Sequence, residues 1–151
     1  MPIPALTADG YLPVGEFDCD LTEVQQTFGI NDHRVGLLDK LGAFLEWLRD
    51  HHGLELPFYI DGSFTTSKHH PNDIDFVIDL TNAPQDQIGR AFGLWAVERA
   101  AIKENFKVDY WPYVPGAPKD LRAFFQYVRV EELHERQLPM ETRKGILRIE
   151  P

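Results

Sequence analysis

Apolar residues recur every three or four positions between residues 32 and 52, a spacing that gathers them on one face of a helix. The positions are Val35, Leu38, Leu41, Leu45 and Leu48. Asp32 can cap the start of this helix, and Gly53 is a natural stop at its end. A shorter helix is predicted just before it, capped by Asp20 or Thr22 and ending near Phe28.

Three short runs rich in β-branched and aromatic residues predict strands, at residues 58–61, 74–80 and 106–111. Between the second and third runs, Pro84 opens a long helical segment that extends to about Asn105. Helices that alternate with short strands in this order predict an α/β or α+β fold, in which helices flank a small mixed β-sheet.

The two ends of the chain lack a sustained period. Residues 1–20 are expected to form an extended arm, and residues 145–151 an extended tail. A proline-rich loop at 112–118 is followed by a predicted helix from Pro118 to about Val130 and a short helical stretch at 131–136. We therefore predict one domain over residues 1–151, with an arm (1–20), a catalytic core (21–111) and C-terminal helices with a tail (112–151).

Composition narrows the class of protein. The chain of 151 residues has 43% hydrophobic residues, enough for one core, and no apolar run of the length that a membrane span needs. The N-terminus lacks the basic and then apolar order of a signal peptide. Cys19 is the single cysteine, which excludes an intrachain disulfide and a cysteine-cluster zinc site. A cytoplasmic protein that does not enter membranes is expected.

Charge is distributed unevenly along the chain. The net charge is −9, and residues 1–61 hold 11 acidic but only 3 basic side chains. Affinity for a nucleic-acid backbone comes largely from lysine and arginine, so broad non-specific binding of nucleic acid is disfavoured. Residues 62–151 hold 12 basic and 13 acidic side chains, so a local basic groove in this part of the chain is still compatible with the charge distribution.

Residues 60–77 carry the candidate chemistry. The strand at 58–61 leads into Gly62 and Ser63, and the next strand opens with Asp73 and Asp75. Residues i and i+2 of a strand project from the same face, so the two carboxylates are expected side by side. Paired carboxylates suit Mg²⁺, which commonly completes its shell with water and substrate phosphates. Gly62 allows close approach of a phosphate, and Ser63 adds a hydroxyl at the start of a possible helix.

This segment resembles the signature of the DNA polymerase β-like nucleotidyltransferase superfamily: a hydrophobic strand, Gly-Ser, about ten residues, then Asp-hydrophobic-Asp-hydrophobic. That superfamily also uses a carboxylate on a later strand, and Asp109 occupies such a position here. The opening at residues 4–13 and the segment at 61–64 resemble a group of small bacterial and phage-associated proteins of that superfamily.

The resemblance implies a nucleotidyltransferase with a polymerase β palm-like fold. Gly62 and Ser63 would hold the triphosphate, and Lys68 could touch the leaving pyrophosphate. Asp73, Asp75 and Asp109 would bind Mg²⁺ or Mn²⁺. An NTP would then donate its NMP to an acceptor hydroxyl, with pyrophosphate leaving. The acceptor could be a protein, a tRNA or a small molecule. The resemblance also implies a toxin-antitoxin or phage-defence setting. Because only about 40 residues follow Asp109, a partner protein could supply part of the acceptor recognition.

Other interpretations of these residues stay open. The chain could be a catalytically silent nucleotide-binding or protein-interaction module of the same fold. A phosphohydrolase with an Asp-x-Asp motif fits less well, because its nucleophile ends an apolar strand whereas here the apolar run follows Asp73. Asp79 lies about 13 Å along the strand from Asp75, too far for one metal site. Asp61 could add a ligand or stabilise a turn, while Arg90, Arg99 and Lys103 are expected on a solvated helix face.

Overall fold

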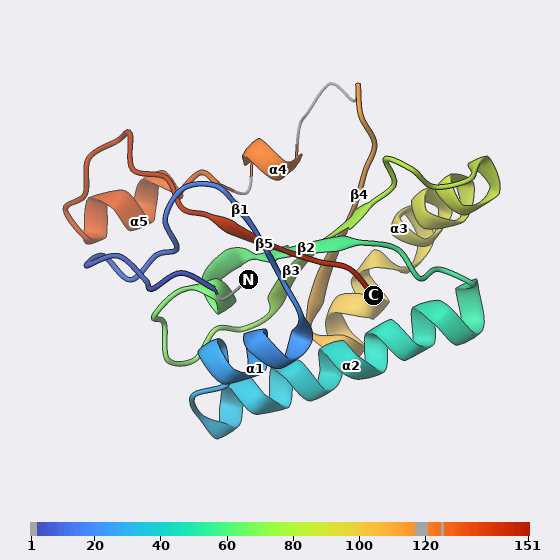
Figure 1. Ribbon diagram of the computed structural model, residues 1–151, viewed down its shortest axis with the longest axis horizontal. Coiled ribbons are helices and arrows are strands. Elements are labelled where there is room, and N and C mark those ends of the chain that lie inside the picture. The colour runs from blue at the N-terminus through green and yellow to red at the C-terminus, as the bar shows by residue number, and fades with distance from the viewer. Residues whose placement is uncertain (1–2, 117–120, 125) are drawn as a thin grey trace.

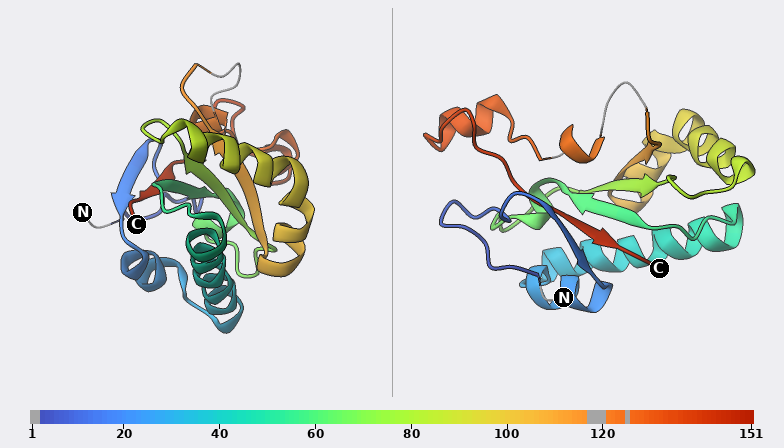
Figure 2. Two further views of the ribbon diagram at one scale, coloured as in Figure 1. Left: turned by 90° about the vertical axis from the view of Figure 1, so that its right-hand side faces the viewer. Right: turned by 45° about the horizontal axis from the view of Figure 1, so that its top comes forward.

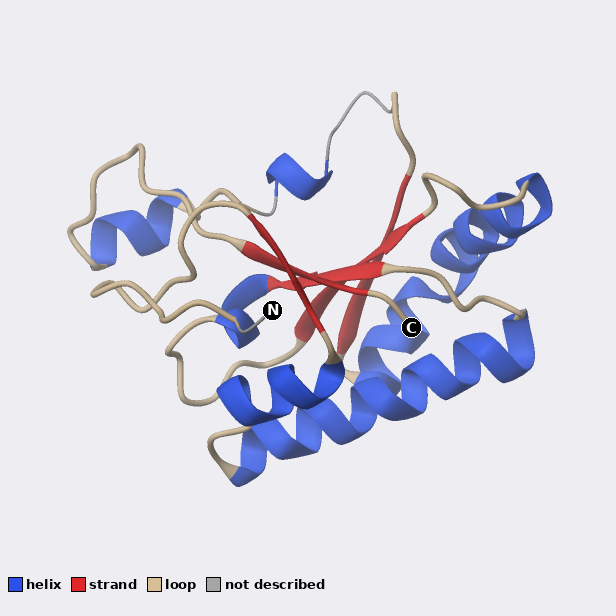
Figure 3. Cartoon of the chain, viewed as in Figure 1, coloured by secondary structure: helices blue, strands red, loops and turns tan. Residues whose placement is uncertain are grey.

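A five-stranded sheet forms the centre of the molecule (Figures 1 and 3). The computed structural model describes residues 3–116, 121–124 and 126–151. In sheet order the strands are β1 (Glu16–Cys19), β5 (Ile146–Ile149), β2 (Phe58–Asp61), β3 (Ile74–Asp79) and β4 (Val108–Tyr113). Strand β2 runs antiparallel to β3 and β5, whereas the β1–β5 and β3–β4 pairs are parallel. The expected α/β arrangement with a small mixed sheet is confirmed.

Four of the predicted helices lie near their expected bounds: α1 (Leu21–Phe28), α2 (Asp32–His52), α3 (Gln85–Phe106) and the short α5 (Val130–Glu135). The short α4 (Leu121–Phe124) departs from its predicted bounds. Asp20 caps α1 in a capping box with Glu23, but Asn31 rather than Asp32 caps α2. Gly53 ends α2 in the left-handed conformation, with φ of 62°. Within the described part of the chain, no helix has both the length and the apolar character to cross a membrane.

The two faces of the sheet are covered differently. Helices α1, α2 and α3 cover one face, where Phe44 of α2 packs edge-on against Phe76 of β3 in the main core. Helix α4 lies over the other face, where Val77 of β3 packs against Tyr59, Tyr113 and Leu121, and α5 lies beyond one end of the strands (Figures 1 and 2). The alternation along β3 therefore sends Ile74 and Phe76 toward the long helices, and Asp75 toward the C-terminal region.

The arm and the tail contain strands that the sequence pattern does not predict. Strand β1 lies inside the arm, and β5 lies inside the tail, inserted between β1 and β2. The β1–β5 pairing joins residues about 130 positions apart, with Glu16 opposite Ile146. A four-residue segment gains strand structure only when such a partner is present, so local periodicity could not reveal it. The sheet thus extends beyond the 21–111 core assigned from sequence.

Two further expectations need correction. Strand β4 includes Pro112, which we had placed in a loop, because β4 is an edge strand and an edge tolerates a residue without an N–H. The helix predicted from Pro118 to Val130 does not run that far, and its start at Pro118 lies outside the described residues. Helix α4 ends at Phe124, and Tyr127 instead bridges to Arg143 in an extended pairing.

Candidate active site

Three carboxylates form a row across three neighbouring strands. In the register of the sheet, Asp75 of β3 lies opposite Asp61 of β2 on one side and opposite Asp109 of β4 on the other. Neighbouring strands are about 4.8 Å apart, and directly paired residues point to the same face, so the three side chains meet at one end of the sheet. Asp73 directly precedes β3 and adds a fourth carboxylate.

These four aspartates line one pocket of about 660 Å³, together with Gly62 and Ser63. Of the residues expected from the sequence, the pocket thus brings together Asp73, Asp75, Asp109, Gly62 and Ser63. Its other wall comes from residues 127–130, Glu132 and Lys144 in the C-terminal region. Asp79 is outside this pocket and is engaged elsewhere, by Thr81 and by Arg148 at 3.6 Å.

The turn after β2 places its backbone directly against Asp75. Gly62 has φ of +82°, and a Cβ atom built on it would lie 2.5 Å from Oδ2 of Asp75. Both the left-handed backbone and the close approach require glycine. The helical turn at Gly62–Thr65 is a single 3₁₀ turn. The sequence predicted a helix N-terminus at Ser63, but only this short turn is present. The proposed contact between Ser63 and a phosphate is therefore supported by the position of Ser63 in the pocket wall.

Burial perturbs the two central carboxyl groups. The pKa of Asp61 is raised to about 8, mainly by desolvation; the charge of Lys144 lowers it and the nearby charge of Asp75 raises it. Desolvation also raises the pKa of Asp75 to about 6, and the charges of Asp73 and Asp109 act in the same direction. One oxygen of Asp61, Oδ2, is buried without a hydrogen-bond partner. Such groups concentrate at functional sites.

Two cations of α3 reach the outer carboxylates. Arg99 pairs with Asp109 at 3.1 Å, and Lys103 pairs with Asp73 at 3.4 Å. The Arg99 guanidinium also lies over the Trp111 ring, 4.0 Å from its centroid. Arg99 and Lys103 are partly exposed, as expected for a solvated helix face, but they also reach the carboxylate end of the sheet because α3 packs along the β4 edge. Arg90 does stay at the surface, paired with Asp86.

The donor set fits a hard divalent cation, but the aspartates are held by protein partners. Among the described residues, no group of three or more His, Cys, Asp or Glu side chains stands in an arrangement that could hold a metal ion. Two of the four carboxylates in the pocket point to Arg99 and Lys103. Binding a metal ion would require Asp73 and Asp109 to exchange these ion pairs for metal ligation, whereas the unpartnered Oδ2 of Asp61 needs no such exchange.

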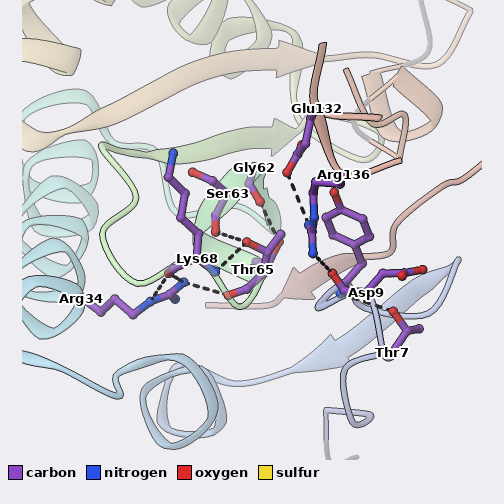
Figure 4. A network of polar contacts seen from close by, with 11 residues as sticks. Thr7, Asp9, Arg34, Gly62, Ser63, Thr65, Lys68, Glu132 and Arg136 are labelled. Atoms are coloured by element: carbon purple, nitrogen blue, oxygen red, sulfur yellow. Dashed lines mark hydrogen bonds and ion pairs between the residues drawn. The ribbon is translucent and has the colours of Figure 1, made fainter. Parts of the chain in front are cut away.

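Lys68, the third candidate for nucleotide binding, lines an adjacent polar pocket rather than the carboxylate pocket. The two pockets share Ser63, Thr66, Arg129 and Glu132, so they form one continuous polar surface. Figure 4 shows the turn from Gly62 to Lys68 between Arg34 on one side and the Glu132–Arg136 pair on the other. Lys68 is exposed and lies beside Ser63 in this second pocket wall.

A buried arginine fixes the turn that carries Gly62 and Ser63. Arg34 of α2 is 0% exposed and donates to the carbonyl oxygens of Phe28, Phe64, Thr66 and Lys68. Figure 4 shows its contact with Lys68. The bonds to Phe64 and Thr66 are 2.6 and 2.8 Å long. The planar guanidinium offers five donors in a fixed fork, which suits this cluster of acceptors. The sequence analysis missed Arg34, because nothing in the local pattern separates a buried arginine from a solvated one.

Lys144 is the second residue that the sequence analysis missed. It precedes β5, is 9% exposed and lines the carboxylate pocket from the C-terminal side. No local signal could assign it, because Lys144 lies just before the predicted extended tail (145–151) and its place in the pocket wall depends on the insertion of β5 beside β2.

Comparison with known proteins places the chain in a family by its sequence. No curated protein matches it, and no solved structure matches it. A family match extends over residues 4–150, nearly the whole chain, and includes every residue of the carboxylate pocket. The chain therefore belongs to the family of unknown function DUF6932.

Proposed function

We propose that this protein is a metal-dependent nucleotidyltransferase with a polymerase β palm-like fold, which moves an NMP from an NTP to an acceptor hydroxyl. The observation that carries the proposal is the row of Asp61, Asp75 and Asp109 across β2, β3 and β4, with the Gly62–Ser63 turn in the same pocket. The Gly-Ser turn, the Asp73–Asp75 pair and Asp109 also match the signature that the sequence resembles, whereas Asp61 departs from the apolar or small residue common before that glycine.

The donor chemistry suits this reaction. Asp73, Asp75 and Asp109 would hold Mg²⁺ or Mn²⁺, and such ions stabilise the charge on the attacking and leaving oxygens of an in-line displacement. Gly62 presents backbone without a side chain, so phosphate oxygens can approach closely, and the Ser63 hydroxyl can donate to them. The acceptor oxygen would form a bond to the α-phosphorus, while the bond between the α-phosphorus and the oxygen that bridges to the β-phosphate breaks. Asp109 would take the hydroxyl proton, and pyrophosphate would leave.

The ion pairs of α3 favour a second candidate function. Because Arg99 and Lys103 engage Asp109 and Asp73, the same site could bind a nucleotide without catalysis, as a sensor or as a partner protein's regulatory module. The two candidates differ in whether Asp73 and Asp109 give up these pairs for a metal ion.

Label transfer separates the two candidates. The purified protein is incubated with each α-³²P-labelled NTP, Mg²⁺ or Mn²⁺, and lysate and RNA from the cells that encode it, and the label is followed on gels. Transfer to a protein, an RNA or a small molecule is expected, and it should be lost in Asp73→Asn and Asp75→Asn. Asp39→Asn, a change on the exposed face of α2, is the matched control.

Three results decide between the functions. Transfer that needs Asp73 and Asp75 supports the enzyme and identifies the acceptor class. Metal-dependent NTP binding without transfer supports the binding module instead. A folded protein that neither binds NTP nor transfers label contradicts both proposals.

A further inference from the structure

Lys144 is held firmly at the wall of the carboxylate pocket. Its backbone N–H donates to the Gln126 carbonyl at 2.8 Å, and the next N–H, of Gly145, donates to the Leu12 carbonyl at 3.0 Å. Lys144 is nine-tenths buried and lines the same pocket as the row of aspartates. The two backbone bonds fix the position from which its side chain enters the pocket wall.

The charge of Lys144 acts on the aspartates without pairing directly to them. It lowers the pKa of both Asp61 and Asp75 against the effect of burial. Yet Lys144 makes no ion pair with the described carboxylates, and Oδ2 of Asp61 has no hydrogen-bond partner. Lys144 and the unpartnered Oδ2 of Asp61 line the same pocket, and a buried polar atom without a partner needs an explanation. A ligand in this pocket could meet both groups.

We propose that Lys144 binds the polyphosphate of the nucleotide, so that the β5 edge supplies the phosphate contact and the β2–β4 row supplies the carboxylates. This inference rests on the proposed function. A lysine amine is a compact point charge that commonly binds phosphates in proteins. The pocket volume of about 660 Å³ lies in the range of small-ligand sites.

The shape of the polar surface favours a triphosphate over a monophosphate. The carboxylate pocket continues into the adjacent pocket, which shares Arg129 with it and adds Lys68 and Arg136, the latter paired with Glu132. A chain of phosphates that starts between Asp75 and Lys144 would therefore meet basic side chains along this direction, although Glu131, Glu132 and Glu135 also line the second pocket. The gain in affinity from each added phosphate should then depend on Lys144.

Binding measurements test this role. Calorimetry with Mg²⁺ compares a nucleoside monophosphate with the four nucleoside triphosphates whose α,β-bridging oxygen is replaced by methylene. Lys144→Met should weaken triphosphate binding about tenfold or more, leave monophosphate binding nearly unchanged and not weaken the binding of Mg²⁺ alone. Lys144→Arg should retain most of the affinity, and Lys40→Met, on the exposed face of α2, should retain all of it.

Protection from acetylation provides a measurement without a variant. In the wild-type protein, the Mg²⁺-bound triphosphate analogue should shield Lys144 from acetic anhydride, as measured by mass spectrometry, while Lys40 reacts equally with and without nucleotide.

Equal loss of monophosphate and triphosphate affinity in Lys144→Met would overturn the inference, as would acetylation of Lys144 that the analogue does not change. Failure of the proposed function is a different result, since the wild-type protein would then bind no nucleotide with Mg²⁺, or Asp75→Asn would bind it equally well.

Discussion

At the scale of single residues, Gly62 is a position in the site where both the backbone conformation and the close neighbour Asp75 disfavour any side chain. Alanine at this position would be strained by the φ of +82°, and its Cβ would lie 2.5 Å from Oδ2 of Asp75. We expect Gly62→Ala to lower the free energy of unfolding by about 1–2 kcal/mol and to displace Asp75, which would abolish metal-dependent nucleotide binding.

The control for Gly62 is Gly93→Ala in α3, where an added Cβ meets nothing within 4 Å. This variant should be as stable as the wild type or more stable by up to about 1 kcal/mol, because alanine is the better helix former. Urea denaturation and calorimetry measure both effects. Normal nucleotide binding by a folded Gly62→Ala protein would contradict the role assigned to the turn.

Asp61 makes stability depend on pH in an unusual direction. An aspartate in an unfolded chain titrates near pH 4, whereas burial raises the pKa of Asp61 to about 8 in the folded protein. Between these values the folded state holds a proton that the unfolded state has lost, so the free energy of unfolding falls as pH rises, by an amount on the order of a few kcal/mol. Asp75, whose pKa is about 6, contributes in the same direction at lower pH.

Thermal denaturation between pH 5 and pH 8 in the presence of a chelator tests this effect. The wild-type melting temperature should fall with rising pH, and Asp61→Asn, which cannot ionise, should flatten the fall and melt higher at pH 8. Asp39→Asn on the exposed face of α2 should follow the wild type. Equal slopes for the wild type and Asp61→Asn would show that Asp61 titrates normally.

At the scale of elements, α2 anchors the turn of the site through Arg34. Lysine keeps the charge but offers one ammonium group in place of the guanidinium fork, so Arg34→Lys leaves carbonyl oxygens of Phe64, Thr66 or Lys68 without donors. We expect a loss of more than about 2 kcal/mol of stability and faster hydrogen exchange across residues 63–68. Arg49→Lys, whose partner Asp50 is exposed, should change stability by less than about 0.5 kcal/mol. Unchanged hydrogen exchange across residues 63–68 in Arg34→Lys would show that this turn is stable without the guanidinium hydrogen bonds.

Elements with a strong local period could be predicted from the sequence. The amphipathic spacing of α2 and the left-handed stop at Gly53 are local, and β2 and β3 are short apolar runs bounded by turn residues. Strands β1 and β5 could not be predicted, because each is four residues long and is stabilised by a partner at the far end of the chain. The end of the predicted 118–130 helix was wrong for the same reason, since Tyr127 pairs with Arg143.

The residues of the candidate site also fall into two groups: those that could be predicted from the sequence, and those whose place depends on which elements become neighbours. Local spacing pointed to Asp73 and Asp75 with Gly62 and Ser63, and the resemblance to the nucleotidyltransferase superfamily pointed to Asp109; one pocket brings the five together. Lys144 and the contacts of Arg99 and Lys103 depend on which elements become neighbours: β5 beside β2, and α3 along the β4 edge. Asp61 had been left open between ligand and turn residue. Its place in the carboxylate row follows from strand register, which pairs it with Asp75 and which the sequence does not specify.

At the scale of the whole molecule, charge bears on the acceptor. The first 61 residues, which contain β1, β2 and the helices α1 and α2 on one face of the sheet, hold 11 acidic and 3 basic side chains. Residues 62–151 are nearly balanced, with 13 acidic and 12 basic side chains. A nucleic-acid acceptor would therefore have to approach from the C-terminal side of the carboxylate pocket, where Lys68, Arg129 and Lys144 lie.

This distribution predicts weak binding of unstructured RNA. Fluorescence anisotropy with a labelled single-stranded RNA of mixed sequence should show no binding at micromolar protein and 150 mM salt, because few phosphates can be neutralised and few counterions released. Lowering the salt to 50 mM should strengthen binding only slightly, since the slope of affinity against salt scales with the number of phosphate contacts. Micromolar binding with a steep salt dependence that Arg129→Gln reduces would contradict this expectation. It would make tRNA, rather than a protein or a small molecule, the acceptor to test first for label transfer.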